Sequence, residues 1–451
     1  MAAEKDFDIA IIGGGISGLT LAIALHHRGL RVQIYEQAPH FGEIGAGVAF
    51  TGNAVQAMRH CHHGVYAAFE RVRTGNLWPS KRKVWFDYHD GYHRSQPAAS
   101  STEGEGEETE EETFAFSIRN DLGQAGVHRA RYLDELVKLL PAEKAVFGKR
   151  LEKLEERGRE NAKDERRWRL WFHDGTHADA DAVIGCDGIK SQVRAWMFGA
   201  ESRYAHPTYT HKYAYRALAE MEDAVRAIGE EKAYNACMHM GPGGHMLTFP
   251  VNHGKTLNIV AFHTTEDDWP DYTRLTRPAT REDALRDFQG YGHDVRSLLQ
   301  LCQPNLDIWA IFHLGDNPLP HYNHSSVLLI GDAAHATSPH HGAGAGMCIE
   351  DSAVLADLLH ACCTRADLPA AFQTFNDLRR DRGNWLVQTS RHIGDCYEWM
   401  ADGVGDDFAR IEAEINTRNG MIADVSVEGM CERAKEVLAA RVQGDGTRGR
   451  L

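Results

Sequence analysis

Alternating apolar and polar segments near the N-terminus predict a strand, a helix and a second strand in close succession. Residues 7–12 (FDIAII) are almost continuously apolar, as in a strand buried on both faces of a parallel sheet. Residues 17–28 repeat apolar positions with helical spacing, and Gly29 ends that pattern. A further strand pattern follows at residues 31–36. Together these segments predict one complete βαβ unit.

Later apolar segments predict more of the same sheet, interrupted by a different kind of structure. Residues 182–188 and 326–331 are short apolar runs that end in turns, as buried strands do. Between them, residues 205–320 contain β-rich pieces separated by turn residues, which indicates an inserted sheet. After Gly344 the apolar spacing is mainly helical.

Composition and charge exclude several classes of protein. The chain has 451 residues, 43% of them apolar and 25% charged, which is ordinary globular composition and excludes fibrous and disordered classes. No apolar stretch approaches the roughly 18 residues of a membrane-spanning helix, and no signal-peptide pattern is present. The formal net charge of −15 argues against nucleic acid as a partner.

Two local features refine that picture. Seven acidic residues lie between Glu103 and Glu112, so residues 100–113 are expected to form a solvated loop. The nine cysteines are scattered without a C-x-x-C pair, which predicts reduced thiols and a cytoplasmic protein. Histidines 60, 62 and 63 are near Cys61, but adjacent positions rarely supply a tetrahedral ligand set, so no metal site is predicted.

The turn between the first predicted strand and helix carries a dinucleotide-binding motif. Gly13, Gly15 and Gly18 fit G-x-G-x-x-G. Gly13 permits the tight turn, Gly15 lets the backbone approach a pyrophosphate, and Gly18 allows close helix packing. The helix N-terminus, with Ile16 and Ser17, offers N–H groups to phosphates. Glu36 ends the second strand, where its carboxylate can accept hydrogen bonds from a ribose. This motif alone does not distinguish FAD from NAD.

Three further motifs carry a family resemblance. They are GDAAHA at residues 331–336, PHHGAGAG at 339–346 and CDGIKS at 186–191. Along the chain, the glycine loop, CDGIKS and then GDAAHA with PHHGAGAG resemble, in that order, the motifs of class A flavoprotein aromatic hydroxylases. Finer matches resemble salicylate hydroxylases: FGEIGAGV at 41–48, VHRA at 127–130, AYR at 214–216, GHMLTFPV at 244–251 and QTS at 388–390. Fungal phenol-dearomatising monooxygenases are also similar and share the His340-His341 pair.

The resemblance implies a fold and a division of the chain. The fold expected is α/β, a Rossmann-like FAD-binding domain with an inserted mixed β-sheet substrate domain and C-terminal helices. Residues 1–204 would form the first part of the FAD-binding domain and residues 205–320 the substrate-binding sheet. Residues 321–451 would then complete the FAD-binding domain and add the C-terminal helices.

The resemblance also implies FAD as cofactor, with NADH or NADPH and O₂ as co-substrates. Asp332 would contact the ribityl chain, Arg129 the pyrophosphate, and Asp187 the neighbourhood of the cofactor or the nicotinamide. The helix after Gly344 would direct its positive end at the flavin. The other cofactor-binding residues implied are Gly47, Val48, Gly342 and Ala345.

The implied reaction is hydroxylation of a phenolic small molecule through a flavin C4a-hydroperoxide. Arg216 can hold a carboxylate or phenolate, and His340 or His341 can take the phenol proton near neutral pH. Phe249 and His245 would also contact substrate. A structural salt bridge for Arg216 and a plain core position for Phe249 are the alternatives.

Two questions about the reaction stay open in the sequence. Salicylate, converted to catechol with loss of CO₂, is the substrate expected. An orcinaldehyde-type or other polyketide phenol that is dearomatised is the alternative. From another class, a non-hydroxylating FAD oxidoreductase would keep the first glycine motif.

Overall fold

The computed structural model describes residues 5–42, 47–92, 113–157 and 167–448. The predicted acidic loop lies outside these residues, except for Thr113, which begins strand β5 (Thr113–Arg119).

A six-stranded sheet contains the strands that the sequence predicted for the first domain. Its order is β18-β19-β11-β1-β2-β7, and its pairs are parallel apart from the β18–β19 pair. The strands are β1 (Asp8–Ile12), β2 (Arg31–Tyr35), β7 (Ala145–Val146), β11 (Ala182–Gly185), β18 (Asn323–His324) and β19 (Val327–Leu329). The predicted βαβ unit and the two later predicted strands therefore belong to one sheet.

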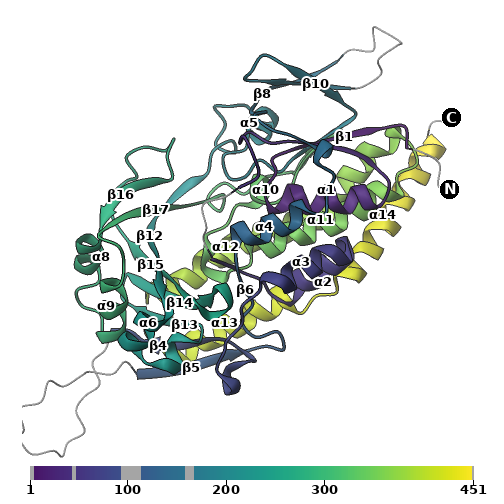
Figure 1. Ribbon diagram of the computed structural model, residues 1–451. Helices are drawn as coiled ribbons and strands as arrows, with labels where there is room; N and C mark the ends of the chain where they lie inside the picture. Colours follow the sequence, from purple (N-terminus) through teal and green to yellow (C-terminus); the bar gives the residue numbers. More distant parts are fainter. Residues whose placement is uncertain (1–4, 43–46, 93–112, 158–166, 449–451) are drawn as a thin grey trace, which may run out of the picture.

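Helices pack beside this sheet and enclose the main apolar core. Helix α1 (Ile16–His27) contacts α11 (Gly344–Ala361), which also contacts α2 (Gly52–Cys61) and α14 (Val427–Arg448) (Figure 1). Helix α11 is buried along almost its whole length because these neighbours surround it. The remaining helices are α3 (His63–Val72), α4 (Arg129–Val137), α5 (Gln192–Phe198), α6 (Met221–Ile228), α7 (Glu230–Ala233), α8 (Arg281–Asp287), α9 (His293–Gln300), α10 (Asp332–His335), α12 (Leu368–Tyr397) and α13 (Phe408–Ala423).

An eight-stranded sheet forms the other end of the molecule, with the order β16-β17-β12-β15-β14-β13-β4-β5 (Figure 1). All its pairs are antiparallel except β13 with β4. Its other strands are β4 (Val84–Asp90), β12 (Thr208–Glu220), β13 (Cys237–Gly241), β14 (Gly244–Val251), β15 (Thr256–Thr264), β16 (Thr276–Thr280) and β17 (Asn305–His313). Apolar clusters fill both of its faces.

This sheet extends beyond the range 205–320 that the sequence predicted for it. Strands β4 and β5 come from residues 84–119, which were assigned to the first part of the FAD-binding domain. Strand β4 pairs with β13, about 150 residues later. A domain boundary predicted from the sequence does not include such a pairing, because the two strands are far apart in the chain.

Two small sheets complete the described fold. Strands β8 (Leu151–Glu156), β9 (Trp168–Phe172) and β10 (His177–Ala180) form one, and β3 (Gly47–Ala49) pairs with β6 (Gly126–His128) in the other. In the part of the chain that the structure describes, no helix is both long and apolar enough to cross a membrane.

Candidate active site

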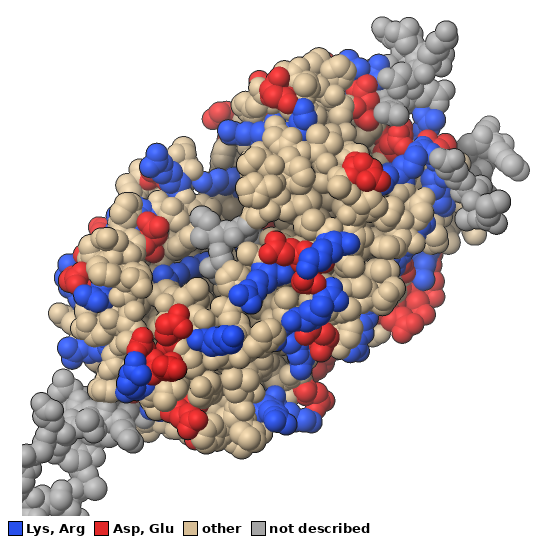
Figure 2. Space-filling model, viewed as in Figure 1, with Lys and Arg blue, Asp and Glu red and all other residues tan. Residues whose placement is uncertain are grey.

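A cavity of about 1070 Å³ lies where the two large sheets approach each other. Its wall combines the ends of β1, β2 and β11 with side chains from β12, β14 and β15, and with residues before and at the start of α11. Ligand pockets usually enclose about 300–1,000 Å³, so this cavity can hold a large cofactor together with a small substrate. On the face drawn in Figure 2, basic and acidic side chains are interspersed, and the described residues form no continuous basic stripe there.

The predicted glycine loop forms one end of the cavity. Gly13 has a φ of +101°, and a Cβ there would lie 2.4 Å from the carbonyl oxygen of Cys186. Gly15 precedes α1, and a Cβ on it would have no atom within 4 Å. Gly18 does not line the cavity, because a Cβ there would lie 2.0 Å from the carbonyl oxygen of Gly13. The three glycines thus match the turn, the open phosphate side and the close helix packing.

The carboxylate of Glu36 holds this loop in place. Its Oε2 atom accepts a hydrogen bond from the Gly14 N–H at 2.6 Å, and Oε1 accepts one from the Ala38 N–H at 2.8 Å. Glu36, Ile16 and Ser17 also line the cavity. Glu36 therefore lies beside the glycine loop and lines the cavity.

Helix α11 points its N-terminus toward the cavity. Gly342 has a φ of +64°, and Gly344 and Ala345 begin the helix and line the wall. No acidic side chain occupies its first turn, so the positive end of the helix dipole is free to stabilise negative charge. Asp332, at the start of α10, lines the wall nearby. The structure thus places both predicted features at the cavity.

Four more predicted cofactor residues line the cavity: Gly47, Val48, Arg129 and Asp187. The Asp187 carboxylate accepts hydrogen bonds from the Ser191 hydroxyl at 2.6 Å and from the N–H groups of Gln192 and Val193. Burial raises its pKa. Asp187 therefore shapes its own loop at the start of α5 and presents that loop to the cavity.

Arg216 and Phe249 supply the wall on the side of the larger sheet. The guanidinium carbon of Arg216 lies 5.0 Å from the centroid of the Trp309 ring. Its Nε atom is buried without a hydrogen-bond partner, and no carboxylate of the described residues pairs with it. Burial and the charge of Arg129 lower the pKa of Arg216 to about 10. The salt-bridge alternative for Arg216 is therefore not what the structure shows.

The two histidines of the PHHG segment also line the cavity, in the 3₁₀ turn η4 (Pro339–His341). Burial and the charge of Lys212 hold the pKa of His340 well below its ordinary value. Burial lowers the pKa of His341 to about 3. The sequence suggested that one of them titrates near neutrality, but both rings are desolvated beside positive charge and are therefore neutral at that pH, with a nitrogen free to accept a proton.

His245, which the sequence placed at the substrate, does not line the cavity. Its side chain is fully buried behind the wall, stacked on Phe262 with ring centroids 4.6 Å apart. Its Nδ1 atom lies 3.1 Å from Oε1 of Glu398. The residue shares one face of β14 with Leu247 and Phe249, but Phe262 and His340 pack against its ring and line the cavity in its place.

Sequence reasoning missed most of the apolar and aromatic wall. The residues concerned line the cavity from β4, β13, β14, β15 and α12: Trp85, Phe86, Tyr88, Met238, Leu247, Val260, Phe262 and Tyr397. The alternation of Val260 and Phe262 along a predicted strand was a usable signal, because alternate residues share one face. No comparable signal marks β4, whose seven residues are all buried.

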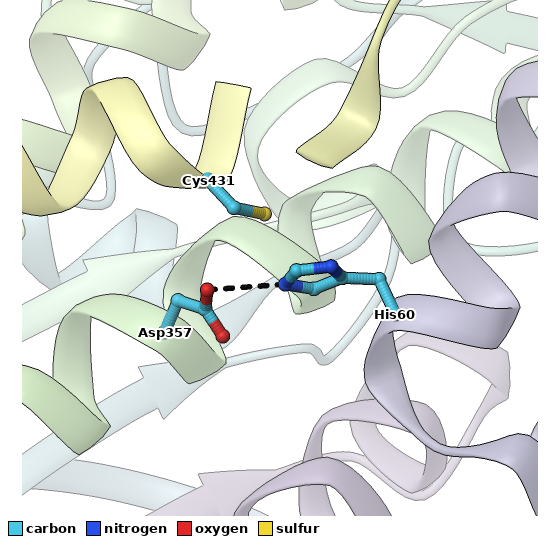
Figure 3. A group of neighbouring side chains, drawn as sticks. All are labelled: His60, Asp357 and Cys431. Atoms are coloured by element: carbon cyan, nitrogen blue, oxygen red, sulfur yellow. Dashed lines mark hydrogen bonds and ion pairs between the residues drawn. The ribbon is translucent and has the colours of Figure 1, made fainter. Parts of the chain in front are cut away.

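A separate group of His60, Asp357 and Cys431 joins α2, α11 and α14 (Figure 3). His60 Nε2 lies 3.1 Å from the Asp357 carboxylate. That carboxylate also binds Arg28 at 3.0 Å and lies 3.4 Å from Lys435. Burial raises the pKa of Cys431 to about 12, so the thiol stays protonated. A metal ion requires a deprotonated thiol and is repelled by the positive charges of Arg28 and Lys435. The group is therefore better described as an ion pair between helices than as a cation site.

A dinucleotide-binding loop meets a second sheet across one large cavity, and the families and proteins similar to this chain identify FAD as its cofactor. The family described as "FAD binding domain" matches residues 100–390, and that described as "NAD(P)-binding Rossmann-like domain" matches residues 11–73. The FAD-dependent monooxygenase pigN of Monascus ruber is 43% identical over 98% of both chains. Salicylate hydroxylase asL1 of Sarocladium schorii is 36% identical, covering 98% of this chain and 93% of its own.

A solved structure titled "Salicylate hydroxylase substrate complex" is 32% identical, with a TM-score of 0.79 over 95% of this chain and 98% of that chain. This chain belongs to the family of FAD-binding monooxygenases. It is an FAD-dependent monooxygenase with the predicted α/β fold. The residues present fit FAD: Gly15 leaves open space at the start of α1, and the N-terminus of α11 carries no acidic residue.

Proposed function

We propose that the enzyme hydroxylates a phenol that carries a carboxylate or carbonyl group beside its hydroxyl, with salicylate as the substrate. The observation that carries this proposal is Arg216, a cation in the cavity wall that no described carboxylate neutralises. The guanidinium lines the cavity and its Nε atom is buried without a partner, so an anionic substrate would satisfy it with charge-assisted hydrogen bonds.

The chain's own residues supply binding, orientation and exclusion of water. Arg216 holds the carboxylate or phenolate, while Phe249 and Phe262 flank the ring on the sheet side. Their apolar surroundings strengthen the attraction between Arg216 and the substrate anion. FAD, once reduced by NADH or NADPH, supplies the chemistry that delivers an oxygen atom from O₂.

The proposed reaction consumes O₂, the hydride of NADH or NADPH and two protons. One atom of O₂ forms a bond to the ring carbon that carries the carboxylate, and the other leaves as water with the electrons of the nicotinamide hydride. The bond from ring to carboxylate breaks to release CO₂, and the ring becomes catechol.

A second candidate substrate is an orcinaldehyde-type phenol, which would be dearomatised. The apolar wall favours it, because Trp85, Met238 and Leu247 also line the cavity. Salicylate has no alkyl group to cover these side chains, whereas a methylated ring has. Arg216 would then bind the phenolate.

Product analysis separates the candidates. We expect FAD-loaded enzyme to oxidise NADH faster with salicylate and to form catechol and CO₂, detected by mass spectrometry. Hydroxylation of 2,4-dihydroxy-6-methylbenzaldehyde without catechol formation would favour the second candidate. NADH oxidation that yields only H₂O₂ with both phenols would contradict both.

The variant Arg216→Met tests the residue that carries the proposal. We expect the Kd of salicylate, measured from the change in the FAD spectrum, to rise about 10- to 100-fold, because a hydrogen bond to a charged group contributes about 1.5–3 kcal/mol. Arg277→Met is the matched control, because Arg277 stacks on Trp269 of the same sheet region without lining the cavity. Equal effects of the two substitutions would contradict the role of Arg216.

We also propose a reducing compartment such as the cytoplasm. All nine cysteines are free thiols, and eight of them are buried. Proteins of oxidising compartments commonly pair their cysteines.

A further inference from the structure

A buried polar cluster lies directly behind the cavity wall, outside the residues that contact the cavity. Glu398, which follows α12, is fully buried. Its Oε2 atom lies 2.7 Å from Lys212 Nζ and accepts a 2.7 Å hydrogen bond from the Thr264 hydroxyl. Its Oε1 atom lies 3.1 Å from His245 Nδ1. Lys212 has a second partner in Asp395, at 2.6 Å.

The charges in this cluster are fixed by their neighbours. Burial alone would raise the pKa of Glu398, but the hydrogen bond from His245 and the charge of Lys212 outweigh it and hold the pKa well below its ordinary value. Glu398 is therefore a carboxylate, which can only accept hydrogen bonds. His245 must then donate its Nδ1–H to Glu398, so in the neutral ring Nε2 is left as an acceptor.

Two imidazole nitrogens next to this cluster are buried without partners. They are Nε2 of His245 and Nδ1 of His340. The two ring centroids lie 5.2 Å apart with an interplanar angle of 61°. This separation permits a hydrogen bond after a small ring rotation, or through one bridging water. Leaving both nitrogens unpaired would cost about 1–3 kcal/mol each.

The pairing of these nitrogens has one consistent arrangement of protons. Because His245 Nε2 is an acceptor, His340 must donate from Nδ1. His340 Nε2 is then the acceptor of a ring that lines the cavity. The hydrogen-bonding groups therefore form a chain from the Glu398 carboxylate through His245 and His340 to the cavity. In this chain the carboxylate orients the His245 ring, and the His245 ring orients the His340 ring.

We propose that Glu398 and His245 are positioning residues that make His340 Nε2 the acceptor of the substrate's phenolic proton. This inference rests on the proposed function, since it needs a phenol in the cavity. The O–H bond of the phenol breaks, its proton binds His340 Nε2, and the Nδ1 proton of His340 is shared with His245 Nε2. The resulting positive charge is stabilised by the Glu398 carboxylate, and the phenolate by Arg216.

Other charged and titratable groups surround the two rings and affect the protonation of His340. They are Lys212 on β12, Tyr397 at the end of α12 and His341 in the same turn as His340. Lys212 opposes protonation of His340, and Glu398 favours it. Removing the carboxylate while keeping Lys212 should therefore weaken His340 as a proton acceptor.

The test measures the ionisation of a bound phenol without turnover. The probe is 2,4-dihydroxy-6-methylbenzaldehyde, whose phenolate absorbs at longer wavelength than its phenol, added to FAD-loaded enzyme without NADH. In the wild-type enzyme we expect the bound probe to ionise at a lower pH than the free probe. In Glu398→Gln and in His340→Gln we expect the midpoint to rise by about one pH unit or more.

The double variant separates positioning from a general structural effect. If Glu398 acts through His340, the Glu398→Gln/His340→Gln midpoint will equal that of His340→Gln alone. His313→Gln is the matched control, because His313 is a buried histidine 3.4 Å from the Asp316 carboxylate and does not line the cavity. FAD content and Tm confirm that each variant is folded. If Glu398→Gln does not fold, the variant His245→Asn is used in its place, because His245→Asn retains the ion pair between Glu398 and Lys212.

Three results would overturn the inference: an unchanged midpoint in folded Glu398→Gln, additive shifts in the double variant, or an equal shift in His313→Gln. Failure of the proposed function has a different signature. In that case neither salicylate nor the aldehyde would perturb the spectrum of the wild-type enzyme, and the inference would fail with it.

Discussion

Two glycines three positions apart show how one motif combines two physical requirements. Gly15 faces open space in the cavity, whereas Gly18 lies against the carbonyl oxygen of Gly13. Because Gly15 has no side chain, a ligand has room beside it. Because Gly18 has no side chain, the protein's own backbone can pack against it.

Alanine substitutions should separate these requirements. We expect Gly15→Ala to weaken FAD binding about 10- to 100-fold and to leave the Tm of the FAD-free protein unchanged, because the new methyl group meets only the ligand. Gly18→Ala should lower the Tm of the FAD-free protein, since overpacking costs about 1–3 kcal/mol. The FAD-to-protein ratio and thermal unfolding measure both effects. A lower Tm in FAD-free Gly15→Ala would contradict this reading.

Among helices, the contact of α11 with α12 depends on a fully buried ion pair. Asp351 on α11 accepts hydrogen bonds from the Gly331 N–H at 3.0 Å and from Arg379 Nε at 2.8 Å. His335 Nε2 lies 2.6 Å from the same carboxylate. Because Gly331 precedes Asp332, this pair also positions a cofactor-binding turn.

The pair should make stability depend on acid pH. Burial raises the pKa of Asp351, but His335 and Arg379 outweigh it and hold the pKa at about 2. Since the folded pKa lies below the unfolded value of about 3.9, the carboxylate stabilises the fold above pH 4, by about 2.6 kcal/mol. That contribution should disappear as the pH falls through 2. Urea unfolding between pH 5 and pH 2 measures it.

The matching substitution is Asp351→Asn, which we expect to lower the free energy of unfolding at pH 7 by about 3–5 kcal/mol, because it breaks a buried pair. Asp316→Asn is the control: Asp316 pairs with Arg391 at a partly exposed site, where an ion pair contributes about 0–1 kcal/mol. Equal losses in the two variants would contradict the role of the buried pair.

For the whole molecule, the cavity links parts of the chain that are far apart in sequence. Gly15, Asp187, Arg216 and Gly344 all line it, from two sheets and two helix ends. A ligand that contacts all of these parts binds the folded chain and not the unfolded one.

FAD should therefore stabilise the whole enzyme. At a free FAD concentration about 100 times its Kd, the gain is about 2.7 kcal/mol, which for a chain of 451 residues corresponds to a rise in Tm of about 3 °C. Differential scanning calorimetry with increasing FAD measures the shift. ADP, which lacks the flavin, should give a smaller rise at the same concentration, and an equal rise would mean that only the adenosine end is bound.

The sequence by itself determined the local features. The βαβ unit and the G-x-G-x-x-G turn follow from apolar spacing and from glycine conformations that depend on a few neighbouring residues. The GDAAHA and PHHGAGAG segments identified the family, and with it FAD. Most of the predicted cofactor residues belong to these local motifs, and they line the cavity.

Only the tertiary structure decided the features that depend on distant partners. Strand β4 joins the second sheet through β13, and His245 meets Glu398 across more than 150 residues of chain. The low pKa of His340 likewise comes from burial and from Lys212. Desolvation and pairing depend on what packs around a group, and a linear pattern does not contain that information.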